Sequence, residues 1–197
     1  MGMENYCLEK DRPLSGGHIS PMPIKSLYMD KSGMPYVVRS AYPDDADDIV
    51  SLIRTVGREE VYIANEDDYY SAEQQRRILT QLNDAVQLVL VAESQGQVFG
   101  TLEAVRGTFR KNRHVVTFGM ALSEAFRGQG RGAGLIATME EWAARGAVQK
   151  IALSVFESNE RAIRFYEHHG YHKEAARPGQ FVIQGRMVAE VFMAKYL

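Results

Sequence analysis

A glycine-rich run between a β-branched segment and an amphipathic segment most strongly limits how this chain can fold. Residues 126–134 read Phe-Arg-Gly-Gln-Gly-Arg-Gly-Ala-Gly, and they join a strand-like stretch at 114–122 to a helix-like stretch that ends near Gly146. Glycine lets successive backbone N–H groups turn toward one point, and the helix N-terminus adds its dipole. The run therefore predicts a strand–loop–helix unit able to hold a pyrophosphate, with a turn required only by chain geometry as the alternative.

Two other phosphate-binding motifs fit this run less well. The dinucleotide pattern G-x-G-x-x-G is met only loosely, by Gly128, Gly130 and Ala133. A Walker loop needs Gly-Lys-Ser/Thr, and here Gly132 is followed by Ala133, which excludes it.

Hydrophobic periodicity predicts a single domain from residue 36 to 197. The expected order is β-α-α-β-β-β-α-β-α-β-β, a mixed sheet with helices on its faces. Ser71 to Gln74 reads as a capping box for the second helix, and a bulge is expected near Gly119. Residues 1–35 show no clear period and predict an irregular arm. The strands are expected at 36–39, 87–92, 98–105, 114–122, 150–156, 180–183 and 188–196, and the helical faces are Ile49, Val50, Leu52, Ile53 and Val56, then Ile78, Leu79 and Leu82, then Leu135, Ile136, Met139, Trp142 and Ala143.

A second motif follows the strand at 150–156. Asn159 begins a helix that Gly170 closes, and Tyr166 lies seven residues further on. At about 100° per residue, seven steps return to within about 20° of the start, so both side chains lie on one helix face. They would either face a ligand together or serve as an N-cap and a core residue. Taken without the glycine-rich run, the second interpretation is preferred.

Together these segments resemble the GNAT superfamily of N-acetyltransferases. Arg127-x-x-Gly130-x-Gly132 is similar to its coenzyme A pyrophosphate motif, and 159–166 followed by Gly170-Tyr171 is similar to its last helix. The stretch 39–46 resembles its opening strand and first helix. The resemblance covers residues 36–197 and implies an α/β (mixed α+β) fold with a central, mostly antiparallel sheet of about seven strands and helices on both faces.

The resemblance also implies roles for particular residues. The loop amides would hold the pyrophosphate of acetyl-CoA, and the end of the preceding strand would pair with the pantetheine arm. Asn159 would contact the pantetheine, and Tyr166 would give a proton to the departing thiolate. The loop residues are Arg127, Gly128, Gln129, Gly130, Arg131 and Gly132, and the strand residues are Met120, Ala121 and Leu122.

An amine must lose a proton before it attacks, and the strand at 114–122 contains no acid. Glu103 on the preceding strand is the first candidate for the base, with a solvent-facing strand residue as the equal alternative. Glu59 and Glu60 are candidates for holding a cationic acceptor, although an exposed helix end is the preferred interpretation. The acidic residues 66–68 mildly favour a cationic acceptor over other amines.

Two further patterns predict no site. The basic residues at 106–113 form a turn about 30 Å from the pyrophosphate loop, so a solvated turn is favoured over phosphate or nucleic-acid binding. His168 and His169 are adjacent and point to different faces, which does not suit a helical metal site. The sequence therefore predicts neither a metal nor a nucleic-acid partner.

Composition fits a protein of the cytoplasm. The net charge of −2 gives no general attraction to nucleic acid or anionic lipid, and the lone Cys7 forms no internal disulfide. No apolar run approaches the ~20 residues that span a bilayer, and no signal-peptide pattern is seen.

The expected function is transfer of the acetyl group of acetyl-CoA to a primary amine. The acceptor is either a small molecule or a peptide amine, and a homodimer is left open. The alternative is a non-catalytic module that binds acyl-CoA.

Overall fold

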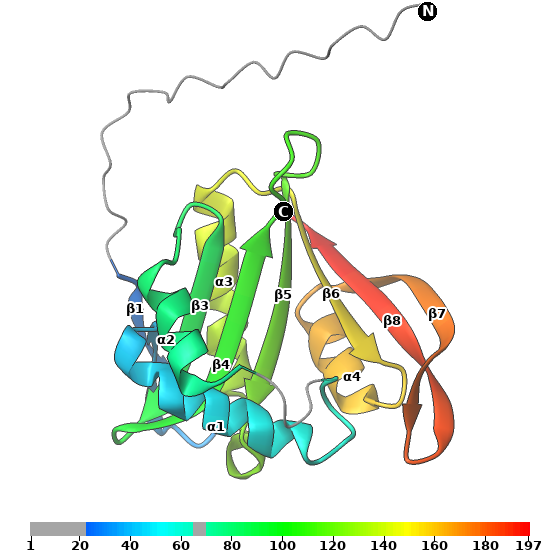
Figure 1. The fold of residues 1–197 in the computed structure, drawn as a ribbon, viewed down its shortest axis with the longest axis horizontal. Helices are drawn as coiled ribbons and strands as arrows, with labels where there is room; N and C mark the ends of the chain where they lie inside the picture. The colour runs from blue at the N-terminus through cyan, green and yellow to red at the C-terminus, as the bar shows by residue number, and fades with distance from the viewer. Residues whose placement is uncertain (1–22, 65–69) are drawn as a thin grey trace, which may run out of the picture.

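The computed structural model describes residues 23–64 and 70–197, which form one eight-stranded sheet with helices against both faces (Figure 1). The strand order is β1-β2-β3-β4-β5-β6-β8-β7, and only the β5–β6 pair is parallel. The predicted fold class is thus confirmed, with eight strands in place of about seven. The strands are β1 (Lys25–Met29), β2 (Pro35–Ser40), β3 (Gln87–Ser94), β4 (Gln97–Arg106), β5 (Val115–Leu122), β6 (Lys150–Phe156), β7 (His172–Ile183) and β8 (Arg186–Tyr196). The helices are α1 (Ala46–Gly57), α2 (Ala72–Thr80), α3 (Gly132–Arg145) and α4 (Glu160–His168), with 3₁₀ turns at Pro43–Asp45 and Glu124–Phe126.

The additional strand, β1, lies in the segment that was expected to be irregular. It pairs antiparallel with β2, from Lys25 opposite Arg39 to Met29 opposite Pro35. The prediction is wrong here because Leu27 and Met29 point outward and are more than 60% exposed, so the apolar residues do not mark a buried face. Residues 1–22, including Cys7, lie outside the described residues.

The two helices α1 and α2 cover one face of β3 and β4. Every apolar residue predicted for the buried face of α1 is buried. The Ser71 capping box is confirmed, because the Gln74 amide donates to Ser71 Oγ (3.2 Å) and the Ser71 amide donates to Gln74 Oε1 (2.8 Å). The buried face of α2 is formed by Gln75 and Leu79, however, while Ile78 is half-buried and Leu82 follows the helix end. The glutamine was not foreseen.

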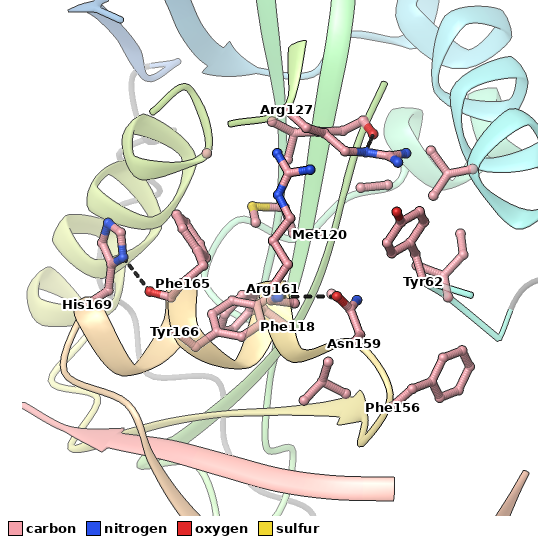
Figure 2. A pocket seen from close by; sticks show the side chains of 18 of the residues that line it. Tyr62, Phe118, Met120, Arg127, Phe156, Asn159, Arg161, Phe165, Tyr166 and His169 are labelled. Atoms are coloured by element: carbon pink, nitrogen blue, oxygen red, sulfur yellow. Dashed lines mark hydrogen bonds between the residues drawn. The ribbon is translucent and has the colours of Figure 1, made fainter. Parts of the chain in front are cut away.

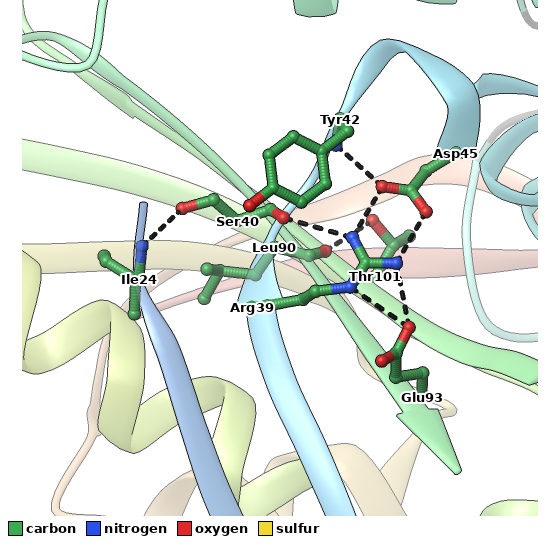
Figure 3. A network of polar contacts seen from close by, with 8 residues as sticks. All are labelled: Ile24, Arg39, Ser40, Tyr42, Asp45, Leu90, Glu93 and Thr101. Carbon is green, nitrogen blue, oxygen red and sulfur yellow. Dashed lines mark hydrogen bonds and ion pairs between the residues drawn. The ribbon is translucent and has the colours of Figure 1, made fainter. Parts of the chain in front are cut away.

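A polar network fixes the entry to α1 (Figure 3). The Arg39 guanidinium donates to both carboxylate oxygens of Asp45 (2.7 and 2.8 Å) and to Glu93 (2.8 and 3.1 Å). Burial opposes ionisation of Asp45, but hydrogen bonds from Arg39 and from the Tyr42 amide outweigh it, and the pKa of Asp45 lies below its ordinary value. These contacts join β2, β3 and the start of α1, which anchors the helix over the sheet.

The centre of the sheet opens between β5 and β6. These strands pair only from Val115 opposite Lys150 to Thr117 opposite Ala152, and beyond that point they diverge, as Figure 1 shows. The register between β4 and β5 is continuous from Gly100 to Arg106, so the bulge expected near Gly119 is absent, and the irregularity lies in β3 at Ala92/Glu93. None of the helices in the two described ranges is long and apolar enough to cross a membrane.

Candidate active site

The divergence of β5 and β6 opens a cavity of about 600 Å³ on the sheet face that carries α3 and α4. We call it the loop-side cavity. Its walls are the glycine-rich loop, the end of β5 and the inner face of α4, so the structure brings the two predicted motifs together (Figure 2). Residues predicted to serve this site that line the cavity are Met120, Ala121, Leu122, Arg127, Gly128, Gly130, Arg131, Gly132, Asn159 and Tyr166.

The loop presents a row of free backbone donors. Gly128 and Gly130 have φ of 79° and 83°, values that non-glycine residues rarely adopt. Within residues 23–64 and 70–197, the five successive amides from Gly128 to Gly132 have no hydrogen-bond acceptor. Because these amides precede the first turn of α3, they fit a pyrophosphate, and the predicted role of this loop is chemically sound.

The two arginines of the loop do different work from its glycines. The Arg127 amide already donates to the Glu124 carbonyl (3.1 Å), so the pyrophosphate role expected of this amide does not fit. The Arg127 guanidinium makes a two-pronged ion pair with Glu59 (2.6 Å each) and stacks on Tyr62. Arg127 therefore ties the loop to the segment after α1.

Arg131 is buried, and its side chain turns away from the loop-side cavity. The guanidinium pairs with Asp30 (2.9 Å) and lies over the rings of Phe99 and Phe126. Hydrogen bonds from the Met34 amide and from Arg131 outweigh burial, which opposes ionisation, and leave the pKa of Asp30 below its ordinary value, so the ion pair persists at neutral pH. The Arg131 side chain therefore holds the base of the loop, and its backbone amide is the group left free for a ligand.

A third arginine, Arg161 on α4, was not foreseen. Its Nη2 lies 2.9 Å from the place where a Cβ on Gly128 would be, so the guanidinium stands directly over the loop. Within the described part of the chain it has no ion pair, and Figure 2 shows it extending across the cavity. The only sequence signal was its position two residues after Asn159, on the first turn of the helix.

The end of β5 offers an open edge to a ligand. Met120, Ala121 and Leu122 pair with β4 on one side, but β6 does not pair with them on the other. The Leu122 carbonyl accepts from Arg127 Nε (2.8 Å), so that group is already used. The rest of this edge can pair with an extended ligand as a further strand would.

Asn159 lies at the mouth of the loop-side cavity. Its side-chain oxygen accepts from the Ala162 amide (3.1 Å), which makes it the N-cap of α4. The N-cap interpretation thus holds, and its amide NH₂ group is left to face the cavity.

Tyr166 lines the same cavity from the middle of α4. Its ring packs edge-on against Phe118 and Tyr171, with centroids 5.9 Å apart in both pairs. Burial raises the pKa of the phenol, so it is protonated at neutral pH. No described residue bonds its hydroxyl, which leaves the proton available to a ligand.

Glu103 lies on the other side of β5, in a second cavity of about 440 Å³ that we call the helix-side cavity. It stands opposite Val89 on β3 and Gly119 on β5, on the sheet face covered by α1 and α2. Gly119 has no side chain, and a Cβ there would meet open space, so this part of the wall is hollow. Burial raises the pKa of the Glu103 carboxyl. Glu103 is half-buried and lines this cavity, and its role as the base stays a prediction.

The two cavities meet at the point where β5 leaves β6. Phe118, Gly119, Met120, Ala121, Ile63 and Ser154 line both. A ligand in one cavity can thus reach a ligand in the other through the opening in the sheet.

The remaining candidates lie elsewhere. Glu59 is paired with Arg127 and is not free to hold a cation, while Glu60 ends the turn after α1 and lines neither cavity. The acidic residues 66–68 lie outside the described residues. In the described ranges, no group of three or more His, Cys, Asp or Glu side chains could hold a metal ion.

Comparison with known proteins agrees with this geometry. The model of the acetyltransferase (GNAT) family matches residues 53–171, which run from the last residues of α1 through α4 and include most of the residues that line the two cavities. The chain belongs to the acetyltransferase (GNAT) family. It is accordingly an acetyl-CoA-dependent N-acetyltransferase. The residues of this GNAT enzyme that suit acetyl-CoA line the loop-side cavity.

Solved structures share the fold at low identity. A GNAT-family acetyltransferase from Streptococcus pneumoniae has a TM-score of 0.75 and 22% identity, covering 82% of this chain and 99% of its own. A ribosomal-protein-alanine N-acetyltransferase from Brucella melitensis has a TM-score of 0.73 and 23% identity, and the match covers 81% of this chain and 99% of its own. A phosphinothricin acetyltransferase from Sinorhizobium meliloti, solved with acetyl-CoA, has a TM-score of 0.74 and 19% identity, and the match covers 82% of this chain and 88% of its own. A comparison with curated proteins finds no match.

Proposed function

We propose that this enzyme acetylates a primary amine that enters through the helix-side cavity, while acetyl-CoA lies in the loop-side cavity. The observation that carries the proposal is that the two cavities, on opposite faces of the sheet, meet at Phe118–Ala121. Acetyl-CoA supplies the acetyl group as a thioester, whose C–S bond breaks as the bond from the amine nitrogen to the carbonyl carbon forms.

The chain's own residues hold the coenzyme in place. The amides of Gly128 to Gly132 and the Arg161 guanidinium bind the phosphates, and the open edge of β5 aligns the pantetheine arm. A β5 amide near Ala121 would also stabilise negative charge that develops on the carbonyl oxygen.

Two residues move protons. Glu103 takes a proton from the ammonium form of the acceptor, either directly or through water, because a protonated amine has no lone pair for attack. Tyr166 gives a proton to the coenzyme sulfur as it leaves, and the second proton that the nitrogen loses as the amide forms restores the phenol. Burial keeps the phenol protonated at neutral pH, so the proton for the leaving sulfur is in place when the amine attacks.

Isothermal titration with acetyl-CoA and an assay of thiol release with an amine panel test the proposal. We expect binding with a stoichiometry of one and turnover with at least one amine. Absence of acetyl-CoA binding at millimolar concentration would contradict the proposal, and binding without turnover of any small amine or peptide would favour the acyl-CoA-binding alternative.

The expected location and assembly are also proposals. We expect a cytoplasmic protein that takes its acceptor as a monomer or a homodimer. Light scattering after size-exclusion chromatography gives the assembly directly.

A further inference from the structure

Gln75 on α2 is the most deeply buried polar side chain of the helix-side cavity. It is 2% exposed, and it lines the cavity together with Glu103. Among the described residues, its carbonyl oxygen Oε1 is buried and has no hydrogen-bond partner. Buried polar atoms nearly always have a partner, and an unmet one lowers stability, so this orphan points to a ligand.

The other polar side chains of this cavity also offer acceptors and few donors. Thr101 Oγ1 donates to the Leu90 carbonyl (3.0 Å), and Thr117 Oγ1 lies within donating distance of the Val105 carbonyl (3.5 Å). Glu103 is a carboxyl with no described partner. Only Ser154, at the junction with the loop-side cavity, has an uncommitted hydroxyl.

No cationic side chain of residues 23–64 and 70–197 lines the helix-side cavity. Its remaining wall is apolar, contributed by α1, by β3 to β6 and by β8. A carboxylate or phosphate on the acceptor would therefore be buried without a positive partner, which is strongly unfavourable. An ammonium group, in contrast, meets Glu103. The apolar lining residues are Ile49, Ile53, Ile63, Val89, Val105, Phe118, Met120, Ala121, Ala152, Leu153 and Phe192.

We propose that the acceptor is a small cationic amine on an apolar body, with a second hydrogen-bond donor for Gln75 Oε1 and no carboxylate or phosphate. The cavity volume of about 440 Å³ lies in the range of small-molecule sites and suits a compact ligand. The inference rests on the proposed function, because it assigns the acceptor of the same reaction. Gln75 is a specificity residue that recognises the far end of the acceptor while Glu103 meets its amine.

Matched amines test the acceptor class, with thiol release measured at saturating acetyl-CoA. Tyramine carries an amine, an apolar ring and a distal hydroxyl; tyrosine adds a carboxylate, and 2-phenylethylamine lacks the hydroxyl. We expect kcat/KM for tyramine to exceed that for tyrosine by roughly 100-fold or more, since the carboxylate would be buried unpaired. We expect it to exceed that for 2-phenylethylamine about three- to tenfold, as for one neutral hydrogen bond. A parallel pair, 1,4-diaminobutane and ornithine, repeats the carboxylate test on an aliphatic body.

Gln75→Leu tests the role of the orphan oxygen. The variant keeps the side chain's approximate size and removes the unmet acceptor, so its melting temperature should be unchanged or higher. KM for tyramine should rise about three- to tenfold and its advantage over 2-phenylethylamine should disappear, with the Kd of acetyl-CoA unchanged. Gln81→Leu, an exposed glutamine at the end of α2, is the matched control and should change none of these values.

The outcomes separate this inference from the proposed function. Failure to bind acetyl-CoA contradicts the proposed function itself. If the enzyme binds acetyl-CoA but prefers tyrosine or ornithine, turns over peptides only, or turns over no amine of the panel, the acceptor class alone is overturned. A lower melting temperature in Gln75→Leu with an unchanged amine preference would give Gln75 a purely structural role.

Discussion

The two cavities that meet at β5 differ in the chemical groups that they present to a ligand. On the loop side, the groups that we propose bind a ligand are mainly backbone amides, presented by Gly128 and Gly130 and by the open edge of β5. On the helix side, they are two side chains, Glu103 and Gln75, in an apolar wall. Backbone amides are kept through most substitutions, whereas a single substitution replaces a side chain. Coenzyme binding on the loop side should therefore be shared between related enzymes, and acceptor binding on the helix side should differ between them.

The structural neighbours agree with this contrast. Two of them share the fold at TM-scores of 0.73 and 0.74, yet one is named for a ribosomal-protein alanine and the other for phosphinothricin. The fold therefore does not select the acceptor. Variants on each side of β5 should change different constants, and the predictions below use this separation.

The largest effect is expected for Tyr166→Phe in the loop-side cavity, beside Phe118, which lines both cavities. The ring keeps its packing on Phe118 and Tyr171, but the proton for the leaving sulfur is lost. We expect kcat to fall roughly 10²-fold or more, as for a lost general acid, with little change in the Kd of acetyl-CoA. Steady-state kinetics and titration calorimetry measure the two constants.

Tyr171→Phe is the matched control. This buried tyrosine contacts Tyr166 but donates its hydroxyl to Glu140 (3.1 Å) and lines neither cavity. Its loss should lower stability by roughly 1.5–3 kcal/mol, as for a hydrogen bond to a charged group, and leave kcat unchanged. An equal fall of kcat in both variants would mean that Tyr166 acts through packing.

Glu103→Gln should lower kcat/KM for the amine roughly 10²-fold near pH 7. Without the base, only the unprotonated amine reacts, and its fraction rises about tenfold per pH unit below an amine pKa of about 10. The deficit should therefore shrink as the pH rises toward 9. The Kd of acetyl-CoA should not change. A deficit that is constant with pH would remove Glu103 from proton transfer.

The same variant gives a stability test with a defined sign. Burial raises the pKa of Glu103 above that of the unfolded chain, so the folded state binds the proton more tightly. The wild type should lose stability as the pH rises from below the ordinary carboxyl pKa through the raised one. Glu103→Gln should show none of that loss, and thermal unfolding from pH 4 to 8 measures the difference. If Glu103→Gln is less stable than the wild type at pH 8, the half-buried, ionised Glu103 carboxylate does not destabilise the fold.

The loop side was predictable from sequence because its chemistry lies in backbone geometry. That Gly128 and Gly130 are glycines indicates their positive φ. The helical period places Asn159 and Tyr166 on one face of their helix. What the sequence could not show was which amides were already used, as the Arg127 amide is, or that the arginine side chains would hold Glu59 and Asp30 instead of a ligand.

The helix side was largely invisible in the sequence. Period-two alternation left Glu103 undecided, because the choice of face depends on α1 and α2, which lie far away in the chain. The buried face predicted for the second helix did not include Gln75, and only packing shows that this side chain is buried. β1 was missed for a related reason, since its apolar Leu27 and Met29 face outward at the edge of the sheet.

Arg161→Gln should act on the loop side alone. The guanidinium over Gly128 should bind phosphate, so its removal should weaken acetyl-CoA binding about tenfold and make the affinity less sensitive to salt. Titration calorimetry at two salt concentrations measures both effects, and KM for the amine should stay constant. Arg164→Gln, on the same helix but paired with Glu160 and outside both cavities, is the control and should bind like the wild type. Equal losses in both variants would show only a general charge effect of α4.

The smallest effect is expected at Asn159, whose two ends do separate work. Its oxygen caps α4, and its NH₂ group faces the loop-side cavity. Asn159→Ser keeps a capping oxygen, so stability should change little, but it removes the donor and should raise the Kd of acetyl-CoA about threefold to tenfold. Asn159→Ala removes both and should also cost about 1 kcal/mol, which lowers the melting temperature by roughly 2–4 °C for a domain of this size. If Asn159→Ser binds acetyl-CoA like the wild type, Asn159 is a cap alone, and pantetheine recognition on this side of the sheet rests on the backbone of β5.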